Sequence, residues 1–481
     1  MTFAEHAAKS VSDPRVLVQI DLGNLNTQWV NYGAGIWYCD FDNEYPEVGT
    51  AGSWLLNGFT EQGFGEVASM IVDSVAQTSV ASLGALTDAT ESFYWDSGNR
   101  KIYVCLVNYD EPYIHSIMLG IAYGFSFDEF APDNSSQFFE GRLLGSPVVS
   151  QSRDPLFWGK IQYSVGSLSV INTDGKYDTF AQDNDVYGNE ARVKFGYKQL
   201  PIDDYVTIYT GTLQSIGVSE EELELGIIDK RSQLTKPIQY TCTNKNALDA
   251  IVEILVSAYS VIYNETYFDT TAWAAAKANA PNITIDMKKP GAVIDLIEDI
   301  CASTFGLFLI GPDNRYSFKI VDTSTTALTT IVHTDILNRH SIKYDPSEVI
   351  SSVKVGYNKN WDSDYVSPYT FVTDTSAEAA VYLKYKTYNQ KTFYTLLNTA
   401  TAASTYATNI LNYAKDVHGI GELVVPMKYY GYNVADIVNA EITRETTPML
   451  GSAMTSVTKL EITSKAYNLR DGTITFGYRV V

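Results

Sequence analysis

The sequence predicts a mainly β, multidomain protein with α+β insertions, built from β-barrel or β-sandwich domains and one small helix-containing domain. Because domains usually hold about 100 to 200 residues, the 481 residues predict about three or four of them. Short β-branched and aromatic runs alternate with turn residues along most of the chain. The 34 tyrosines, 20 phenylalanines and 7 tryptophans suit pleated sheets and large contacts between subunits.

The first 145 residues are predicted to form an N-terminal β domain. The runs VLVQIDLG, GIWYCDF, KIYVCLV and SIMLGIAYGFS have the composition of strands and are separated by Gly, Asn, Asp and Pro. Residues 94–103 predict a hairpin with a polar, glycine-containing loop. The recurrence of strand-like runs stops at the polar segment from Ala131 to Gln137, which predicts a domain boundary after this segment.

Residues 146–240 are predicted to form a second β domain, a small barrel or sandwich. The runs FWGKIQYSV, GSLSVI, ARVKFGY, YVTIYTGTL and LELGII recur about every ten residues, the spacing typical of such folds. Between two of them, Asn172 to Gly175 predicts a tight turn in which Gly175 takes a positive φ and Asp174 bonds the local backbone.

Residues 241–345 are predicted to form the α+β domain. Either Asn244 or Asn246 can cap a helix that runs to about Val261, with apolar residues three and four positions apart. A second helix is predicted to begin at Pro290 and to end around Gly306, because proline suits a first turn and glycine a helix end.

The rest of the chain is predicted to return to β structure. A hairpin of Leu307 to Ile310 and Tyr316 to Ile320 closes the α+β domain. Residues 346–425 form a β/α segment with a strand from Val349 to Tyr357 and a helix from Ala400 to Lys415. Residues 426–481 form a C-terminal β segment with alternating apolar and polar positions.

The sequence contains none of the motifs that usually announce a hydrolase, zinc protease or nucleotidase, so no catalytic, cofactor-binding or metal residue is assigned. Gly63 to Ala68 lacks the preceding strand of a nucleotide-binding turn, and Gly419 with Gly421 is interpreted as helix termination. The histidines lack the spacing of metal ligands, and the cysteines form no CxxC pair and are expected to be buried free thiols. These residues are His6, His115, His333, His340 and His418, and Cys39, Cys105, Cys242 and Cys301.

Two clusters of acidic residues each allow a functional interpretation beside a structural one. Oxygen ligands of the kind that calcium prefers occur at Asn172, Asp174, Asp178, Asp183 and Asp185. Their spacing does not fit an EF-hand and Lys176 lies among them, so a turn with a solvated loop is favoured, with a calcium site as the alternative. Glu220 to Glu222 is interpreted as a solvated loop, with docking of a basic partner as the alternative.

The formal charge of −22 and the isoelectric point near 4.6 argue against sequence-specific nucleic-acid binding, which needs clustered Lys and Arg. The N-terminus has no basic segment followed by an apolar core, and no uncharged apolar run approaches the ~20 residues that cross a bilayer. We therefore expect synthesis in the cytoplasm and no stable membrane segment.

Residues 142–237 resemble the first barrel segment of tail-tip and baseplate hub proteins of long-tailed phages. The resemblance lies in the strand with Leu168, Val170 and Ile171, the NTDG turn, an Asp-rich crossing loop, ARVKFGY, YVTIYTGTL, and a strand ending in Asp229-Lys230-Arg231. Upstream, Asp110 to Gly124 is similar to the extra N-terminal region of a subgroup with non-contractile tails. Beyond Lys245 the resemblance to this family is limited to the order of helices and strands.

The resemblance implies a homotrimeric hub in which two barrel-like domains per subunit make a pseudo-sixfold ring that closes the tail tube. It implies contacts with a distal tail or tail tube protein, a tape-measure protein and tail fibre or receptor-binding proteins of the virion, and passage of DNA through the channel during host attachment. No peptidase, lysozyme or needle extension is identified, so cell-wall cutting is expected of partners.

Two alternatives stay open. Trp37, Trp54 or Trp95 of the N-terminal domain could present aromatic faces to sugars, as in a carbohydrate- or receptor-binding tail protein, although core packing explains them equally well. A catalytic pair of carboxylates needs only two acidic residues that meet in a cleft, so abundant Asp and Glu leave that class open.

Overall fold

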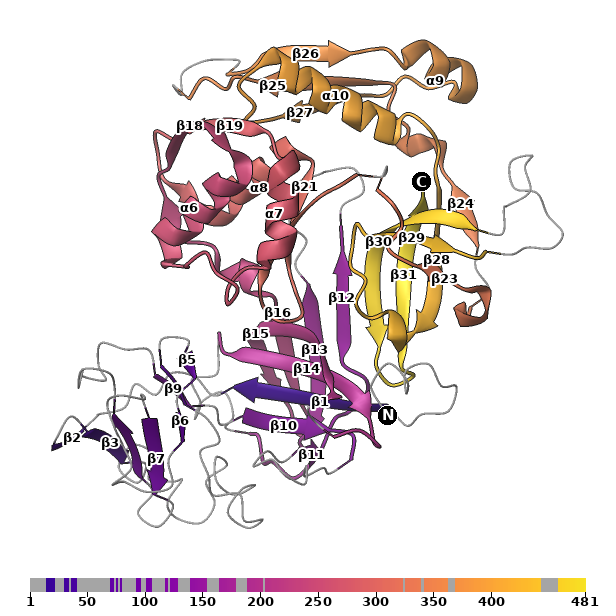
Figure 1. Ribbon diagram of the computed structural model, residues 1–481. Coiled ribbons are helices and arrows are strands. Elements are labelled where there is room, and N and C mark those ends of the chain that lie inside the picture. Colours follow the sequence, from indigo (N-terminus) through magenta and orange to yellow (C-terminus); the bar gives the residue numbers. More distant parts are fainter. Residues whose placement is uncertain are drawn as a thin grey trace. The chain divides into compact units, whose positions relative to one another are not determined.

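The computed structural model describes most of the chain from residue 139 onward and separate strands before it. The described residues are 14–21, 30–33, 36–40, 70–72, 75–76, 78–79, 92–96, 101–105, 117–119, 122–128, 139–153, 164–178, 188–201, 204–322, 325–338, 341–361, 368–442 and 457–481. The chain forms two compact units, Met1–Pro147 with Gly166–Ile227, and Val148–Val165 with Ile228–Val481 (Figure 1). The mainly β, multidomain class is as predicted.

The first unit contains a mostly antiparallel sheet in the order β11-β10-β1-β14-β15-β16-β13. Its strands are β1 (Pro14–Asp21), β10 (Ala122–Ser126), β11 (Glu140–Gly141), β13 (Val165–Ile171), β14 (Glu190–Tyr197), β15 (Val206–Val218) and β16 (Glu222–Ile228). Alternation along β14 buries Ala191, Val193 and Phe195, the spacing of one strand face. In β1 consecutive residues from Val16 to Ile20 are buried, so both faces of this strand are covered.

Strand β1 joins parts of the chain that lie far apart in sequence. It pairs antiparallel with β10, with Asp21 opposite Ala122, and on its other side with β14, with Val18 opposite Val193. The predicted domain boundaries stay predictions, but these two N-terminal strands share a sheet with strands of the predicted 146–240 domain.

The remaining N-terminal strands pair among themselves in the described residues. One sheet has the order β2-β3-β8-β7-β6 and another β5-β4-β9. Their bounds are β2 (Val30–Gly33), β3 (Ile36–Asp40), β4 (Met70–Val72), β5 (Val75–Ala76), β6 (Thr78–Ser79), β7 (Ser92–Asp96), β8 (Lys101–Cys105) and β9 (Ile117–Leu119). The predicted hairpin is confirmed, because β7 pairs antiparallel with β8 and places Asp96 opposite Lys101.

The second unit begins its α+β part with three helices. They are α6 (Ala247–Tyr259), α7 (Thr270–Asn279) and α8 (Val293–Thr304). Asn246 caps α6, since its side chain accepts a hydrogen bond from the Leu248 N–H. Helix α7 was not predicted, because only Trp273 and Ala276 of its ten residues are buried and the apolar period is weak.

Helix α8 and its neighbours correct one detail of the prediction. The helix begins at Val293 rather than Pro290, and the left-handed residue at its end is Phe305, with φ 56°, rather than Gly306. Gly306 instead starts β21, where a Cβ would lie 2.3 Å from the Phe318 ring of the next strand. The adjoining strands are β17 (Pro237–Ile238), β18 (Thr241–Asn246), β19 (Asn282–Asp286), β20 (Gly291–Ala292), β21 (Gly306–Ile310) and β22 (Tyr316–Ile320).

A smaller αβ layer follows in the second unit. Its sheet has the order β26-β25-β27, and α10 packs on one face (Figure 1). The elements are β25 (Ser352–Tyr357), β26 (Thr370–Asp374), α9 (Glu378–Tyr385), β27 (Gln390–Tyr394) and α10 (Ala400–Ala414). The helix from Ala400 is confirmed, and so is the strand that ends at Tyr357, although it begins at Ser352 rather than Val349. Helices α6 to α8, α10 and these strands contribute to one continuous hydrophobic core.

The C-terminal sheet of the second unit has the order β12-β30-β31-β28-β24, with β29 pairing β30 and β23. Its strands are β12 (Val148–Ser152), β23 (Thr330–Ile331), β24 (Ile342–Tyr344), β28 (Gly419–Pro426), β29 (Ile437–Ala440), β30 (Thr458–Asn468) and β31 (Thr473–Val480). Short 3₁₀ turns are η6 (Lys230–Gln233), η7 (His333–Asp335), η8 (Pro346–Glu348) and η9 (Met427–Tyr429).

The interpretation of Gly419 and Gly421 as helix termination is wrong. Both residues belong to β28, where a Cβ on Gly421 would lie 2.5 Å from the Ser341 carbonyl oxygen and one on Gly419 would meet Ile342. They therefore allow β24 to approach closely.

Among the described residues, no helix has the combination of length and apolar composition that bilayer crossing requires.

The pairing of β1 with β10 predicts which part of the N-terminal region can be removed. Asp21 and Ala122 lie opposite each other at the ends of antiparallel neighbours, so an Asn-Gly turn can join them. We expect a variant with Asn-Gly in place of residues 22–121 to stay soluble and to unfold cooperatively in circular dichroism. A fragment starting at Ser146 lacks β1 and β10 and should aggregate. If that fragment folds as well as the turn variant, β1 is dispensable and the boundary near residue 145 holds.

Candidate functional site

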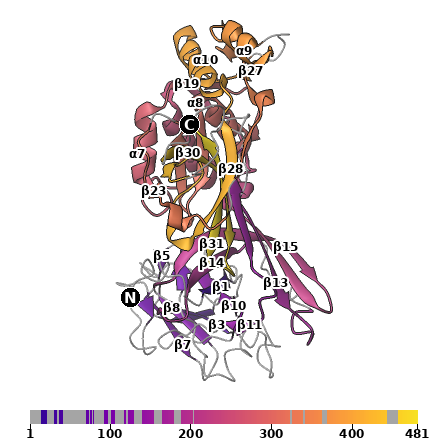
Figure 2. The same ribbon diagram turned by 90° about the vertical axis from the view of Figure 1, so that its right-hand side faces the viewer.

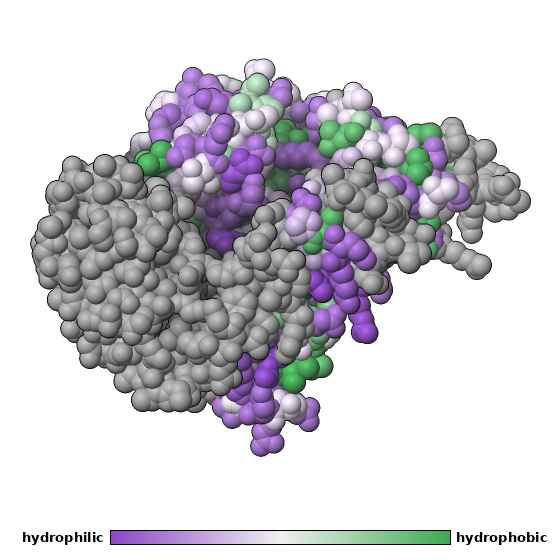
Figure 3. Space-filling model, turned by 60° about the horizontal axis from the view of Figure 1, so that its bottom comes forward, coloured by the Kyte–Doolittle hydropathy of each residue, from purple (hydrophilic) through white to green (hydrophobic). Residues whose placement is uncertain are grey.

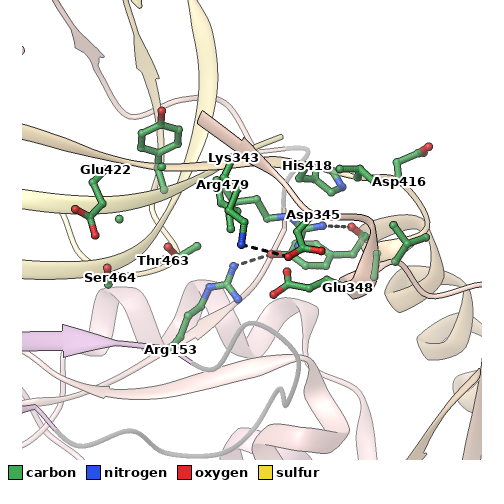
Figure 4. A pocket seen from close by; sticks show the side chains of 18 of the residues that line it. Arg153, Lys343, Asp345, Glu348, Asp416, His418, Glu422, Thr463, Ser464 and Arg479 are labelled. Atoms are coloured by element: carbon green, nitrogen blue, oxygen red, sulfur yellow. Dashed lines mark hydrogen bonds and ion pairs between the residues drawn. The ribbon is translucent and has the colours of Figure 1, made fainter. Parts of the chain in front are cut away.

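A pocket of about 600 Å³ lies in the second unit, and the C-terminal sheet forms its floor (Figure 4). The floor includes Arg479, Ile420 and Lys343, which lie in register on neighbouring strands, and the buried Glu461 of β30 faces Arg479 at the end of this row. Directly opposed residues point to the same face of a sheet, so this row presents its side chains together. The end of α10 and the segments 345–350 and 416–418 form the walls.

A buried ion pair closes one end of this row. Arg153, directly after β12, lies with Nη2 2.9 Å from Oε1 of Glu461, and the two side chains are 1% and 0% exposed. The same Nη2 donates to the Tyr413 hydroxyl at 2.6 Å, and that hydroxyl donates to Oε2 of Glu461 at 2.6 Å. Burial raises the pKa of Tyr413, which keeps its proton available for this bond. The three side chains join β12, β30 and α10.

Arg479 is the second arginine of the pocket and differs from Arg153. Its guanidinium lies over the Tyr413 ring, 3.7 Å from the centroid, and Nη2 donates to the Tyr413 carbonyl oxygen. Within the described residues it has no ion pair, although Glu348 contributes a favourable field, and burial lowers its pKa below the usual value. Lys343 pairs with Asp345 at 3.3 Å. Figure 4 shows Arg479, Lys343 and Asp345 gathered on one side of the pocket.

His418 completes this side of the pocket. Its Nδ1 lies 2.7 Å from the Val480 carbonyl oxygen, which can only accept, so Nδ1 carries the proton. Burial first, and then the charge of Arg479, lower its pKa below the usual value, so the ring is neutral at pH 7. Nε2 is then a buried acceptor that has no hydrogen-bond partner in the described part of the chain.

Gly477 in the floor leaves room for a side chain of the neighbouring strand. Gly477 lies two residues before Arg479 on β31. Ser464 and Glu422 face Gly477 from the two neighbouring strands. A Cβ on Gly477 would lie 2.2 Å from the Ser464 hydroxyl oxygen and 3.4 Å from the Thr463 hydroxyl oxygen. The Ser464 hydroxyl therefore occupies the place that a side chain at residue 477 would take, and the Thr463 hydroxyl lies beside it.

The structure places the predicted acidic cluster in the first unit and gives its residues other partners. Arg142 donates to both carboxylate oxygens of Asp174 at 2.9 and 2.6 Å, and this bond is the main reason that the pKa of Asp174 falls to about 2. Asn172 accepts from the Tyr177 N–H and donates to Asp178, while Gly175 has φ +71°. The turn is confirmed.

These contacts support the turn interpretation over calcium. The described residues include no group of three or more metal-ligand side chains placed to hold an ion. Asp183 and Asp185 lie outside the described residues.

The structure describes some of the other residues singled out in the sequence. Cys242 and Cys301 are free and buried, as predicted. His333 lies on η7, and Glu222 begins β16 after a turn that Ser219 stabilises by accepting from the Glu222 N–H. The side chains of Cys39, Cys105, Trp37 and Trp95, and all of Trp54, Gly63 to Ala68, His6, His115 and His340, lie outside the described residues.

The Asp229-Lys230-Arg231 sequence that supported the resemblance forms a buried structural contact in the second unit. Asp229 accepts from Nε and Nη2 of Arg231 at 2.8 and 2.7 Å and from the Ser164 N–H at 2.5 Å. Arg231 also donates to the Phe308 carbonyl oxygen. Asp229 and Arg231 are each 1% exposed, so they form an internal contact and are not part of the protein surface.

No protein-family model matches the sequence, and no curated protein matches it. Among solved structures, the chain is similar to a tail protein from Neisseria meningitidis MC58, with 15% identity over 72% of this chain and 94% of that one, and a TM-score of 0.46. It is similar to the 43 kDa tail protein of prophage MuSo2 from Shewanella oneidensis, with 12% identity over 74% and 98% and a TM-score of 0.44. It is also similar to prophage tail protein gp18 from Listeria monocytogenes EGD-e, with 10% identity over 71% and 90% and a TM-score of 0.39. With TM-scores below 0.5, these likenesses carry no conclusion about function.

The buried ion pair gives the first prediction from this site. Glu461→Gln should lower the free energy of unfolding by about 3 to 5 kcal/mol, because Arg153 then stays buried without a counter-charge. Asp286→Asn is the control, since Asp286 pairs with Lys288 at the surface with both side chains nearly half exposed, and such pairs contribute at most about 1 kcal/mol. Urea unfolding of the full chain measures both. Equal losses in the two variants would contradict the account.

A second prediction concerns Lys465 of β30, which is 2% exposed and donates to the Tyr430 carbonyl oxygen. Burial lowers the pKa of its ammonium group from 10.5 to about 7. Between these values the unfolded chain binds a proton that the folded chain does not, so the contribution of Lys465 to stability rises with pH.

Comparison with Lys465→Met tests this directly. The stability of the native sequence relative to Lys465→Met should rise from pH 7 to pH 9.5 in urea unfolding. Lys459→Met, at a partly exposed position of the same strand, controls for the loss of a lysine. A Lys465→Met difference that stays constant over this window would show that the buried ammonium keeps its charge.

Proposed function

We propose that this chain is a structural virion protein, the hub subunit at the tail tip or baseplate of a long-tailed phage. In this role it closes the tail tube and joins it to tail-tip and receptor-binding fibre proteins. The observation that carries the proposal is the segment with the family resemblance, residues 142–237. It folds into successive strands β13, β14, β15 and β16 with the predicted turn between the first two, and it ends in the buried contact of Asp229 with Arg231.

The β15–β16 hairpin offers a surface for subunit contacts. Strand β15 has 13 residues, which at ~3.3 Å per residue span about 40 Å. Its residues from Ile208 to Leu213 are buried, whereas Gln214 to Val218 are exposed or half-buried. Figure 2 shows the ends of β13 and β15 extending beyond the other strands of the first unit. A projecting pair of strands with free polar backbone is a common means of joining subunits.

The chemistry of the hairpin tip fits a specific, partly polar contact. Val218 is 39% exposed, and Glu220 and Glu221 follow it at the turn. On the face shown in Figure 3, the described hydrophobic residues form small groups among hydrophilic ones. We therefore propose subunit contacts with apolar anchors inside a polar rim, the anatomy of most specific interfaces.

We propose the number of chains in the assembly and their symmetry from the family resemblance. The strands of the main sheet fall into two sets, from β11 to β13 in the first unit and from β12 to β24 in the second. We propose that each belongs to a barrel-like domain, so that three chains give six related positions for a sixfold tube in closed symmetry. The further proposed partners are a distal tail or tail tube protein and a tape-measure protein. The net charge of −22 would keep DNA from adhering to the wall of such a channel.

A non-enzymatic role agrees with the pocket. Among the described residues of the pocket and its floor, Arg153 pairs with Glu461 and Lys343 with Asp345, and no nucleophile there is paired with a base. We propose that any cell-wall cutting belongs to partner proteins.

The hub proposal predicts a trimer that depends on the hairpin. Native mass measurement of the full chain should give three copies, and Val218→Asp should weaken association at least tenfold, because a carboxylate would be buried in the contact. Val256→Asp is the matched control, since Val256 of α6 is 44% exposed and lies outside the hairpin. A monomer at all concentrations, or equal effects of the two variants, would contradict the proposal. Glycan binding by the monomer would favour the carbohydrate-binding alternative.

A further inference from the structure

The proposed ring of three chains, on which this inference rests, needs two different surfaces on each chain. In a closed ring of three identical chains the contacts are head to tail, so a surface of one copy meets a different surface of the next. The tip of the β15–β16 hairpin is proposed above as one of these surfaces. Its complement then belongs to another part of the same chain.

The hairpin tip presents two carboxylates on an ordered backbone. The Ser219 hydroxyl accepts from the N–H groups of Glu221 and Glu222 at 3.3 and 3.0 Å. The Asn172 side chain donates to the Ser219 carbonyl oxygen, and the Asn172 N–H donates to the Glu221 carbonyl oxygen. Glu220 and Glu221 are exposed and have no ion pair among the described residues. Because the backbone is already held in place, a partner can bind these carboxylates with little further loss of chain entropy.

The sheet of β26, β25 and β27 has α10 on one face (Figure 1) and reaches the protein surface on the other. Val353 and Val355 of β25 are fully buried and belong to the core to which α10 contributes. Gly356 follows Val355 and so belongs to the opposite face, where Phe371 and Tyr394 lie opposite it on the two neighbouring strands. Tyr394 is 57% exposed, so a partner can reach this second face.

Three aromatic rings form one cluster on this second face. The ring centroids of Tyr369 and Tyr394 lie 5.1 Å apart, and the Phe371 centroid lies 6.5 and 6.2 Å from them. A Cβ on Gly356 would lie 3.1 Å from the rings of Phe371 and Tyr369, so the glycine allows these rings to lie close to the sheet. Aromatic rings have few rotatable bonds, so they provide contact area at a low cost in entropy.

Two ammonium groups lie beside the aromatic rings. Nζ of Lys354 is 4.3 Å from the centroid of the Phe371 ring, and Nζ of Lys359 is 5.9 Å from that of Tyr369. Neither lysine has an ion pair in the part of the chain that the structure describes. Cations beside exposed apolar rings are complementary to a segment that is both acidic and apolar. We call this surface the aromatic–lysine face; its residues are Lys354, Lys359, Tyr369, Phe371 and Tyr394.

We propose that the aromatic–lysine face of one copy receives the hairpin tip of the next copy. The tip has the matching composition, because Val218 is 39% exposed beside its two carboxylates. Val218 packs on the aromatic rings, and Glu220 and Glu221 pair with the two lysines. Each chain gives its hairpin tip to one neighbour and receives the tip of the other, so three chains close into a ring.

Charge reversal on both surfaces tests the proposal, with native mass measurement of the full chain over a series of concentrations. Lys354→Glu with Lys359→Glu should weaken association at least tenfold, because like charges would then meet across the contact. Glu220→Lys with Glu221→Lys should weaken it to a similar extent. The chain with all four changes should recover native association to within about threefold, since the opposite charges have only been exchanged.

Lys289→Glu with Lys386→Glu is the matched control, because it changes the net charge by the same amount outside the proposed contact. Lys386 also lies beside a tyrosine, with Nζ 5.7 Å from the centroid of the Tyr382 ring. The control pair should associate as the native chain does. Added to Glu220→Lys with Glu221→Lys, it restores the native net charge but should not restore association.

Thermal unfolding shows whether the two lysine reversals leave the chain folded. If they do not, Lys354→Gln with Lys359→Gln replaces them and should weaken association severalfold, because the two attractive charges are lost. A native trimer whose association is unchanged by the lysine changes, or is not recovered in the four-change chain, would overturn this inference and leave the hub proposal in place. A native chain that is monomeric at all concentrations would contradict the hub proposal and this inference together.

Discussion

The ion pair between Arg153 and Glu461 is the interaction on which the architecture of the second unit depends. Two charges can be buried only if they meet with good geometry, and here the Tyr413 hydroxyl bonds both of them. The pair fixes the end of β12 against β30 and fixes α10 against both. Arg479 then stacks on the same tyrosine, so one ring orients two arginines. Both arginines line the pocket, but only Arg153 is neutralised by a described carboxylate.

Much of the fold could be predicted from local patterns. The cap at Asn246, the hairpin of β21 and β22, the helix from Ala400 and the turn with positive φ at Gly175 are all set by residues within a few positions of one another. The predictions were wrong where a residue far away in the sequence determines the local structure. Gly306 is a glycine because the Phe318 ring needs the space, and Gly419 and Gly421 because β24 lies against them, so none of the three marks a helix end.

The pocket could not be predicted, for the same physical reason. Glu461 and Arg479 belong to β30 and β31, Arg153 follows β12, and nothing in the local sequence of β12 indicates that Arg153 turns inward to a partner about 300 residues away. A weak signal exists in β31, where Arg479 falls on the side opposite the buried Phe476 and Tyr478. The acidic cluster at Asn172 had the stronger sequence signal, yet its described members bond Arg142 and the local backbone.

We propose that copies of this chain form a structural ring at the end of a phage tail. Cryo-microscopy of intact virions that carry the chain tests it most directly. The account predicts density for three copies around the tail axis at the distal end, with the β15–β16 hairpin of each copy at a contact with its neighbour. Six copies in true sixfold symmetry, a single copy, or absence of the chain from the particle would contradict it.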